Sequence, residues 1–385
     1  MRARRPRRAL VGRRQASLWW ATLAALALLV AACGTADPQD AMTPKGPVAE
    51  SQDALWGMVF PIAVAVFILV QGLLLVALIR FRARRDDDDR TLPKQVAGNT
   101  RLEVAWTIIP ALILVAIAVP TVRTIFDLAQ KPADPLEVRV VGKQYWWEFE
   151  YTGEEGKGVV TANELVVPAD RDVYLTMVAT GQQTFAGGAP PAEGEEPQFD
   201  WTGGVIHSFW VPSLAGKQDV VPGHERTMTI NASEPGSYSG QCAEFCGLSH
   251  ANMRFSVEAK TADEFSTWID EQTQGPSPPS SGLAAQGAQL FSGGLEGNAQ
   301  QCIACHGITG VEGAEARQGP DLTNFAERAK FAGYILDNND ENLRAWLADP
   351  QASKPGAQMP NLQLTDDEID ALVAYLRTLD PGASE

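Results

Sequence analysis

The chain has 385 residues, of which 45% are hydrophobic, and a formal net charge of −16. This length leaves room for two or three domains, and the acidic balance argues against nucleic acid as a partner. Four histidines and five cysteines are too few for a general metal store or a disulfide framework. They indicate individual sites instead.

Residues 1–32 are typical of a targeting segment. Arginines crowd the first fourteen positions and precede an apolar run at 18–32, which is shorter than a spanning helix usually needs. The run ends in V-A-A-C-G, which resembles a bacterial lipoprotein cleavage site and implies that Cys33 becomes the lipidated N-terminal residue. A plain signal peptide cleaved near the alanines is the alternative.

An extracytoplasmic segment at 33–54 is followed by two long apolar segments. Residues 55–79 and 104–128 are each predicted to form a helix long enough to cross about 30 Å of hydrocarbon, and membrane helices tolerate the prolines they contain. The loop at 80–103 is rich in arginine and lysine, and basic residues beside membrane helices mark the cytoplasmic side. We therefore expect a two-pass protein of the bacterial cell membrane, with everything after the second helix outside.

Short strands replace helices between 135 and 270. Runs with alternating hydrophobicity, separated by turn residues, occur at 136–141, 172–178, 227–230 and 254–258. This pattern predicts an all-β Greek-key sandwich or barrel. The aromatic run at 142–149 is placed on the first strand, and the Gly-, Pro- and Glu-rich stretch at 181–204 is predicted to be a surface loop.

A cluster of soft ligands lies at 240–253, where two thiols, an imidazole and a thioether are spaced by four, four and three residues. They belong to Cys242, Cys246, His250 and Met253. Such ligands suit copper in an electron-transfer site, although the spacing also permits a disulfide or a structural zinc with a fourth ligand from elsewhere. His207 lies on a strand-like aromatic run at 205–212, and we predict that it completes the same site.

The motifs H-S-F-W-V-P-S-L, V-P-G and G-Q-C-A-E-F-C-G-L-S-H-A-N-M resemble the binuclear copper (CuA) domain of cytochrome c oxidase subunit II. The resemblance implies a cupredoxin fold in which the sulfurs of Cys242 and Cys246 bridge two coppers. It also implies four further ligands: the imidazoles of His207 and His250, the thioether of Met253 and the main-chain carbonyl of Glu244. The Glu244 carboxylate would then reach a magnesium ion shared with subunit I.

Four positions bear on electron and proton transfer in that family. The aromatic run above the copper admits electrons from cytochrome c, which makes Tyr145 and Trp146 candidates for this step. Tyr145 departs from the usual tryptophan, and Gly204 stands where many relatives carry an acidic docking residue, which argues against a separate soluble cytochrome docking in the usual way. The run at 99–110 also resembles the family and implies that Glu103 lies near a proton channel of subunit I, the alternative being an ordinary glutamate at a helix start.

A Pro- and Ser-rich linker at 271–282 leads to a domain at 283–381. Its C-I-A-C-H motif is the attachment sequence for c-type haem, in which Cys302 and Cys305 form thioethers and His306 is the proximal iron ligand. A redox-active C-x-x-C disulfide is the alternative. Met359, in a loop before the last helix, is the candidate sixth ligand, unless it is a loop methionine that makes only apolar contacts.

Three segments of this last domain, at 287–291, 319–322 and 365–379, resemble an all-α class I cytochrome c. Taken as a whole, the multidomain chain resembles subunit II of a caa3-type haem-copper oxidase. The resemblance implies an oxidoreductase subunit, active only with subunit I, that takes electrons from a bc-type complex or a cytochrome c. These electrons would pass from haem c to CuA and on to haem a of subunit I, where oxygen is reduced with proton pumping.

The implied partners are subunits I and III and the lipid membrane. One alternative is the small subunit of a CuA-containing nitric oxide reductase. Another is a membrane-anchored redox or copper-delivery protein. A quinol oxidase subunit fits poorly, because that class lacks these copper ligands.

Overall fold

The computed structural model describes most of the chain from residue 39 onward. The described residues are 39–82, 95, 97–180, 184–185, 199–200, 204–293 and 302–383. Cys33, most of the 181–204 stretch and the tip of the predicted cytoplasmic loop lie outside these residues. The part from Ala41 to Glu385 forms a single unit.

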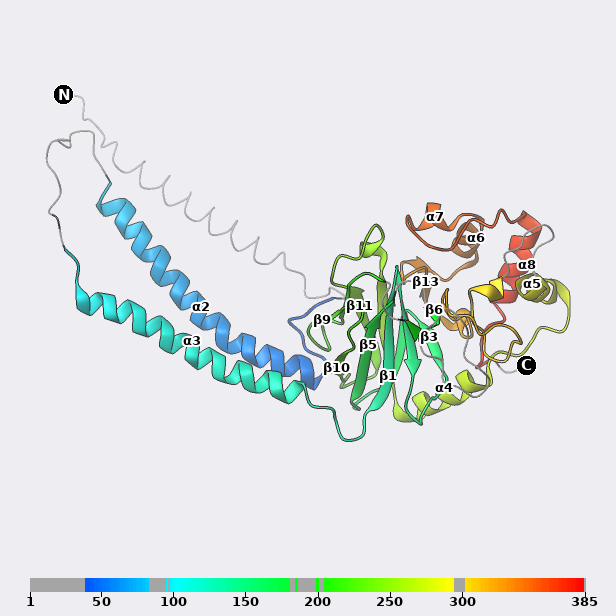
Figure 1. Cartoon of the computed structure of the whole chain (residues 1–385), viewed down its shortest axis with the longest axis horizontal. Helices are drawn as coiled ribbons and strands as arrows, with labels where there is room; N and C mark the ends of the chain where they lie inside the picture. The colour runs from blue at the N-terminus through cyan, green and yellow to red at the C-terminus, as the bar shows by residue number, and fades with distance from the viewer. Residues whose placement is uncertain are drawn as a thin grey trace, which may run out of the picture. The chain divides into compact units, whose positions relative to one another are not determined.

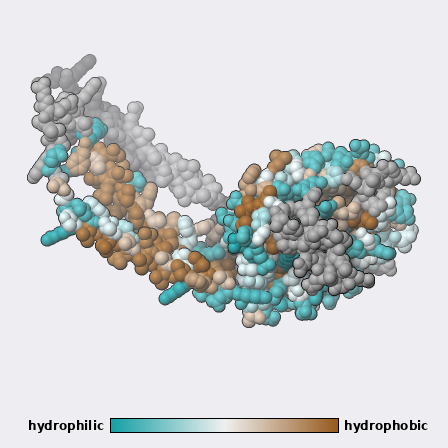
Figure 2. Space-filling model, in the orientation of Figure 1, coloured by the Kyte–Doolittle hydropathy of each residue, from teal (hydrophilic) through white to brown (hydrophobic). Residues whose placement is uncertain are grey.

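Two long helices, α2 (Pro47–Arg80) and α3 (Thr100–Leu128), run beside one another (Figure 1). Both are long and apolar enough to cross a membrane, and Figure 2 shows their hydrophobic side chains on the molecular surface. Because lipid tails are as apolar as these side chains, such exposure is stable only inside a bilayer. The predicted two-pass hairpin is confirmed.

Helix α2 begins earlier than the predicted span at 55–79. Pro47 occupies its first turn, where the missing N–H costs nothing, and Val48 packs into the core of the following β domain. The first turns of α2 thus belong to the extramembrane part of the protein. Helix α3 begins at a conventional cap, in which the Asn99 side chain accepts hydrogen bonds from the amides of Arg101 and Leu102.

Two five-stranded sheets form the β domain (Figure 1). The strands of the first sheet, in spatial order, are β10 (Arg226–Ile230), β5 (Val173–Ala179), β1 (Leu136–Lys143), β2 (Trp146–Tyr151) and β3 (Val160–Ala162). Those of the second are β4 (Glu164–Pro168), β12 (Arg254–Lys260), β11 (Gly236–Cys242), β8 (His207–Trp210) and β9 (Gln218–Val220). Strands that are not consecutive in the chain pair within each sheet, some in parallel, as β1 with β5, and some antiparallel, as β5 with β10. The predicted β-sandwich is confirmed.

Aromatic side chains fill the space between the two sheets. Trp147 of the first sheet meets Phe209 and Phe255 of the second with ring centroids 5.6 and 5.7 Å apart, edge to face, the geometry that aromatic quadrupoles favour. Helix α4 (Ala262–Gln274) closes one end, where Trp268 contacts Tyr151. A short pair, β6 (Thr184–Phe185) and β7 (Phe199–Asp200), lies apart from both sheets.

The aromatic run at 142–149 is not one strand, as the sequence suggested. The chain reverses at Gln144 and Tyr145, and Lys143 at the end of β1 pairs with Trp146 at the start of β2. The four residues on each side of the turn, 140–143 and 146–149, are all buried. They show no alternation that would mark the reversal in the sequence.

The C-terminal domain is built mainly of helices. They are α5 (Gly282–Gly293), α6 (Asp340–Ala348), α7 (Pro350–Ser353), α8 (Asp366–Leu376) and two single 3₁₀ turns, η2 (Cys302–Ala304) and η3 (Phe325–Glu327). Thr365 and Glu368 form the predicted capping box at the start of α8. The all-α expectation is wrong in one detail: β13 (Lys330–Phe331) and β14 (Leu336–Asp337) form a small antiparallel pair.

Candidate copper and haem centres

The predicted copper ligands come from two neighbouring strands and the loop that follows. His207 begins β8 and Cys242 ends β11, and these strands pair so that Cys242 lies opposite Phe209. The loop after β11 contains the 3₁₀ turn η1 (His250–Asn252) and returns into β12 at Met253. The amide of Cys242 donates to the Met253 carbonyl at 2.9 Å, which closes the loop and brings its ends together.

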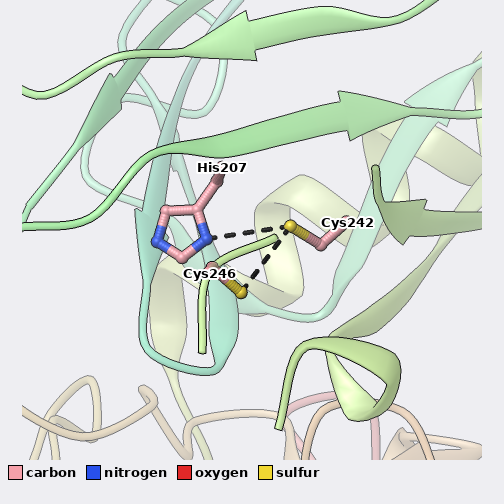
Figure 3. A group of neighbouring side chains, drawn as sticks. All are labelled: His207, Cys242 and Cys246. Atoms are coloured by element: carbon pink, nitrogen blue, oxygen red, sulfur yellow. Dashed lines mark hydrogen bonds between the residues drawn. The ribbon is translucent and has the colours of Figure 1, made fainter. Parts of the chain in front are cut away.

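His207, Cys242 and Cys246 point toward one another (Figure 3). The Nδ1 atom of His207 lies 3.8 Å from the Cys242 sulfur, and the two sulfurs are 3.9 Å apart. A disulfide requires about 2.05 Å, so both thiols are free. The disulfide alternative for these cysteines is therefore wrong.

The remaining donors complete a shell around the two sulfurs. His250 Nδ1 lies 3.6 Å and the Met253 sulfur 3.8 Å from Cys246 Sγ. The Glu244 carbonyl oxygen lies 3.2 Å from Cys242 Sγ. Two thiols and two imidazoles alone would also suit zinc, whereas a thioether is a soft ligand that favours copper.

The two thiols are hydrogen-bonded to each other. This bond, opposed by burial and helped by His207, lowers the pKa of Cys242 to about 3, and it raises the pKa of Cys246. A thiolate is the form that binds metal. His207 and Met253 are fully buried, so the cluster is ready to receive a soft cation in a site that excludes water.

The turn at Gln144 and Tyr145 lies against the ligand loop. Gln144 Nε2 donates to the Cys246 carbonyl at 2.7 Å, and the Tyr145 hydroxyl accepts from the Leu248 amide at 3.1 Å. Trp146 is buried. Tyr145 thus contacts the ligand loop directly, and Gln144 makes a contact with it that no sequence pattern indicated.

The carboxylates of Glu244 and Glu103 have local surroundings. The Glu244 carboxylate accepts only a local bond, from the Phe245 amide at 3.2 Å, and is partly exposed. Glu103 lies in the first turn of α3, where the helix dipole favours a carboxylate. His224, which the sequence places in a turn, is exposed and bonds back to Val221 through its amide.

The haem-attachment residues occupy η2 and the turn after it. The amides of Cys305 and His306 both donate to the Cys302 carbonyl, and both thiols are free. Burial raises the pKa of Cys302 to about 11, whereas a redox-active C-x-x-C motif requires a thiolate. The raised pKa keeps the Cys302 thiol protonated, which argues against the alternative of a redox-active disulfide.

His306 is oriented as a proximal ligand should be. Its Nδ1 lies 2.7 Å from the Pro320 carbonyl, which assigns the proton to Nδ1 and leaves Nε2 as a lone-pair donor for iron. Burial lowers the pKa of the ring and keeps it neutral. A Cβ at Gly319 would lie 2.6 Å from the imidazole, so only glycine permits this packing.

Met359 lies in the loop between α7 and α8 and packs, partly buried, against the core of the domain. The Gln351 side chain donates to its carbonyl at 3.3 Å. Together with His306 it offers the residue types of a His/Met-ligated haem, and the free cysteines offer the thioether positions. The residues present therefore fit a c-type haem.

Comparison with known proteins gives the same division of the chain. Family models match the cytochrome c oxidase subunit II transmembrane domain at 36–124, the periplasmic domain of the same subunit at 136–260, and cytochrome c at 284–380. Cytochrome c oxidase subunit 2 of Alkalihalophilus pseudofirmus is 38% identical over 93% of this chain and 95% of its own length. That of Bacillus subtilis is 35% identical over 93% of this chain and 96% of its own length.

Among solved structures, the periplasmic domain of cytochrome oxidase subunit II from Bradyrhizobium japonicum covers 37% of this chain and 95% of its own. The identity is 26% and the TM-score 0.28.

A membrane-anchored sandwich with a cluster of thiol and imidazole donors, joined to a C-x-x-C-H domain, defines an electron-transfer protein. The chain belongs to the cytochrome c oxidase subunit II family, with a cytochrome c domain fused at its C-terminal end. It is a two-pass membrane subunit of a haem-copper oxidase, associates with subunit I, and has its C-terminal domains outside. Its two extramembrane domains imply CuA copper and haem.

Proposed function

We propose that the chain accepts electrons in its C-terminal domain, passes them to the copper domain and delivers them to haem a of subunit I. Cys302 and Cys305 would hold haem c, with His306 and Met359 as axial ligands. The copper ligands would be the donors that the fold brings together: His207, Cys242, Glu244 through its carbonyl, Cys246, His250 and Met253. The observation that supports this most strongly is the convergence of two free thiols and two imidazoles in a buried site.

When bound, a binuclear copper centre takes up and releases one electron with little rearrangement. The chain's own residues keep that rearrangement small. His207 and Cys242 belong to paired strands, and the loop that carries the other ligands is closed by the bond between Cys242 and Met253. Donors held on strands move less than donors on free loops.

We further propose roles for two carboxylates. Glu244 lies in the ligand loop, and its partly exposed carboxylate would bind magnesium together with subunit I, since magnesium prefers oxygen ligands and keeps an incomplete protein shell. Glu103, in the first turn of α3, would feed protons toward subunit I. The electron donor would be a bc-type complex or a cytochrome c, and subunit III a further partner.

The first test is electron paramagnetic resonance of the oxidised full chain, purified with copper and haem. We expect a signal in which one unpaired electron is shared over two coppers. His207→Asn should abolish this signal, and the matched control His224→Asn, which changes an exposed turn histidine, should keep it. A signal from a single copper, or zinc in place of copper, would refute the binuclear centre.

A second test concerns the covalent link between the domains. A linker of few residues raises the effective concentration of the haem domain at the copper domain. Cutting the chain within 276–281 and diluting the product should therefore slow turnover with the chain's own haem as donor. An unchanged turnover rate would refute a role for the fusion.

A further inference from the structure

The short turn between β1 and β2, residues 143–146, contacts the haem domain as well as the copper loop. Lys143 is buried and forms an ion pair with the buried Glu148 at 2.9 Å. Its Nζ also donates, at 2.6 Å, to the main-chain carbonyl of Arg317 in the haem domain. A lysine aimed at a backbone carbonyl of another domain is a directed, charge-assisted contact.

The haem domain makes the reciprocal contact. Lys354, 3% exposed, donates from Nζ at 2.6 Å to the main-chain carbonyl of Tyr145. Burial lowers the pKa of this lysine to about 7. A buried ammonium persists only where its contacts offset desolvation.

The two haem-domain segments that make these contacts lie next to the two predicted axial ligands. Arg317 shortly precedes Gly319, whose amide donates to the Cys305 carbonyl at 2.7 Å and which packs on the ring of His306. Lys354 begins the stretch that leads to Met359. The turn at 143–146 therefore contacts both the loop that packs on His306 and the segment that leads to Met359.

The same turn is bonded to the copper loop through Gln144 and the Tyr145 hydroxyl, as described above. Gly356, on the haem side, approaches this corner closely: a Cβ there would lie 3.2 Å from the Leu248 side chain and 3.4 Å from the Tyr145 ring. Its φ of +85° is also one that side-chain-bearing residues rarely adopt. The two redox domains thus meet at Tyr145.

Further hydrogen bonds cross between the domains around this corner. The Arg254 amide donates to the Gly333 carbonyl at 2.9 Å. The Ala329 amide donates to the Glu164 carboxylate at 3.0 Å, and the Arg317 side chain to Glu150 at 2.7 Å. These bonds are directional and involve both backbones, so they define one orientation of the haem domain.

We propose that the turn at 143–146 is a docking element that holds the haem domain on the copper domain in one fixed arrangement, with Lys143 and Lys354 as positioning residues. This deepens the proposed function and rests on it for its electron-transfer consequence. Electrons would then cross between the domains through a permanent contact at Tyr145. The linker would help the two domains to assemble, but it would not set the rate of electron transfer.

Hydrogen exchange in the full chain tests the docking without using activity. The amides of Arg254 and Ala329 report directly on the docking, because each donates a hydrogen bond to the other domain. Lys354→Met removes the cation and keeps the apolar volume. We expect both amides to exchange about tenfold faster in this variant, the usual effect of losing a charge-assisted bond, while the Ile369 amide inside α8 is unchanged.

Matched controls remove a cation whose ion pair lies within one domain. Lys131→Met deletes a pair with Glu137 in the copper domain, and Arg344→Met one with Asp370 in the haem domain. Neither should alter the two reporter amides. Lys143→Met alone would leave the buried Glu148 carboxylate without its ion-pair partner. Lys143 is therefore tested by the double variant Lys143→Met with Glu148→Gln. This variant should also speed exchange of the two reporter amides.

The electron-transfer consequence is tested by rapid photoreduction of haem c in the holoenzyme. Lys354→Met should slow transfer to copper, while a Gly/Ser extension that doubles the linker should leave the rate unchanged. A rate that falls with linker length, as for a mobile tethered domain, would overturn the proposal, and so would unchanged exchange in Lys354→Met. The haem spectrum and the copper resonance are recorded first, so that missing cofactors would count against the proposed function and not against the docking.

Discussion

The copper and haem centres are assembled in opposite ways. In the copper domain, six donors from two strands and one loop converge, with the sulfurs 3.9 Å apart and two ligands fully buried. In the haem domain, the attachment cysteines are partly exposed, and His306 is oriented by the Pro320 carbonyl. The copper donors include residues of the sandwich core, whereas the haem-attachment cysteines lie at the edge of a smaller core.

This difference follows from how each domain buries apolar surface. The sandwich has large, fully buried side chains such as Trp147, Phe209 and Phe255, which lie between its two sheets. The haem domain has a smaller core, against which Cys302 and Met359 are only partly buried. A large apolar cofactor bonded to such residues would contribute directly to folding.

The largest effect expected from this comparison is a difference between two pairs of substitutions. Cys302→Ser with Cys305→Ser should abolish haem attachment and leave the 283–381 domain sensitive to proteases. Cys242→Ser with Cys246→Ser should abolish copper binding and oxygen consumption, yet leave the sandwich resistant. Limited proteolysis with mass spectrometry reads both outcomes, and collapse of the sandwich in the second pair would break the comparison.

Met359→Leu should lower the reduction potential of the haem, because loss of a thioether ligand removes a stabiliser of ferrous iron. A redox titration followed by haem absorbance measures the shift. Met228→Leu, at a half-buried position on β10, is the matched control and should leave the potential unchanged. An unaltered reduction potential in Met359→Leu would contradict axial ligation and indicate that Met359 makes only packing contacts.

A pH effect is expected at Glu164. Burial raises the pKa of its carboxyl from 4.5 to about 7, so the folded protein binds this proton more tightly than the unfolded chain. Its contribution to stability is therefore complete below about pH 4.5 and is lost as pH rises through 7, by about 3 kcal/mol at most.

Glu164→Gln removes this dependence. The melting temperature of the variant relative to the unaltered chain should increase steadily from pH 5 to pH 8. Glu225→Gln, at an exposed position, should track the unaltered chain throughout. A constant difference between Glu164→Gln and the unaltered chain would contradict the buried-proton account.

The smallest effect compares two capping boxes. Thr261 caps α4 at the end of the sandwich, and Thr365 caps α8, which contributes many buried residues to the haem domain. Replacing either with alanine should cost about 1 kcal/mol of local stability. Haem-absorbance melting should detect the loss for Thr365→Ala and not for Thr261→Ala. Equal sensitivity would indicate that the two domains unfold together.

Much of this protein could be predicted from short sequence patterns, because several of its sites are local in the chain. Cys242 to Met253 fit within one loop, C-x-x-C-H within one turn, and each membrane span within one apolar run. Periodicity also indicated the strands, although it failed at the Gln144–Tyr145 reversal. There the residues on both sides of the turn are all buried, so no change of pattern marks it.

The tertiary structure decided what depends on distant segments. Only folding brings His207 to the cysteines. Likewise, only the structure shows that Cys242 and Cys246 are free thiols 3.9 Å apart and not a disulfide. The contacts between Lys143 and Arg317 and between Lys354 and Tyr145 join residues 174 and 209 positions apart. A lysine in a sequence gives no sign that it is buried against a carbonyl of another domain, because burial is a property of the packed chain and not of the residue.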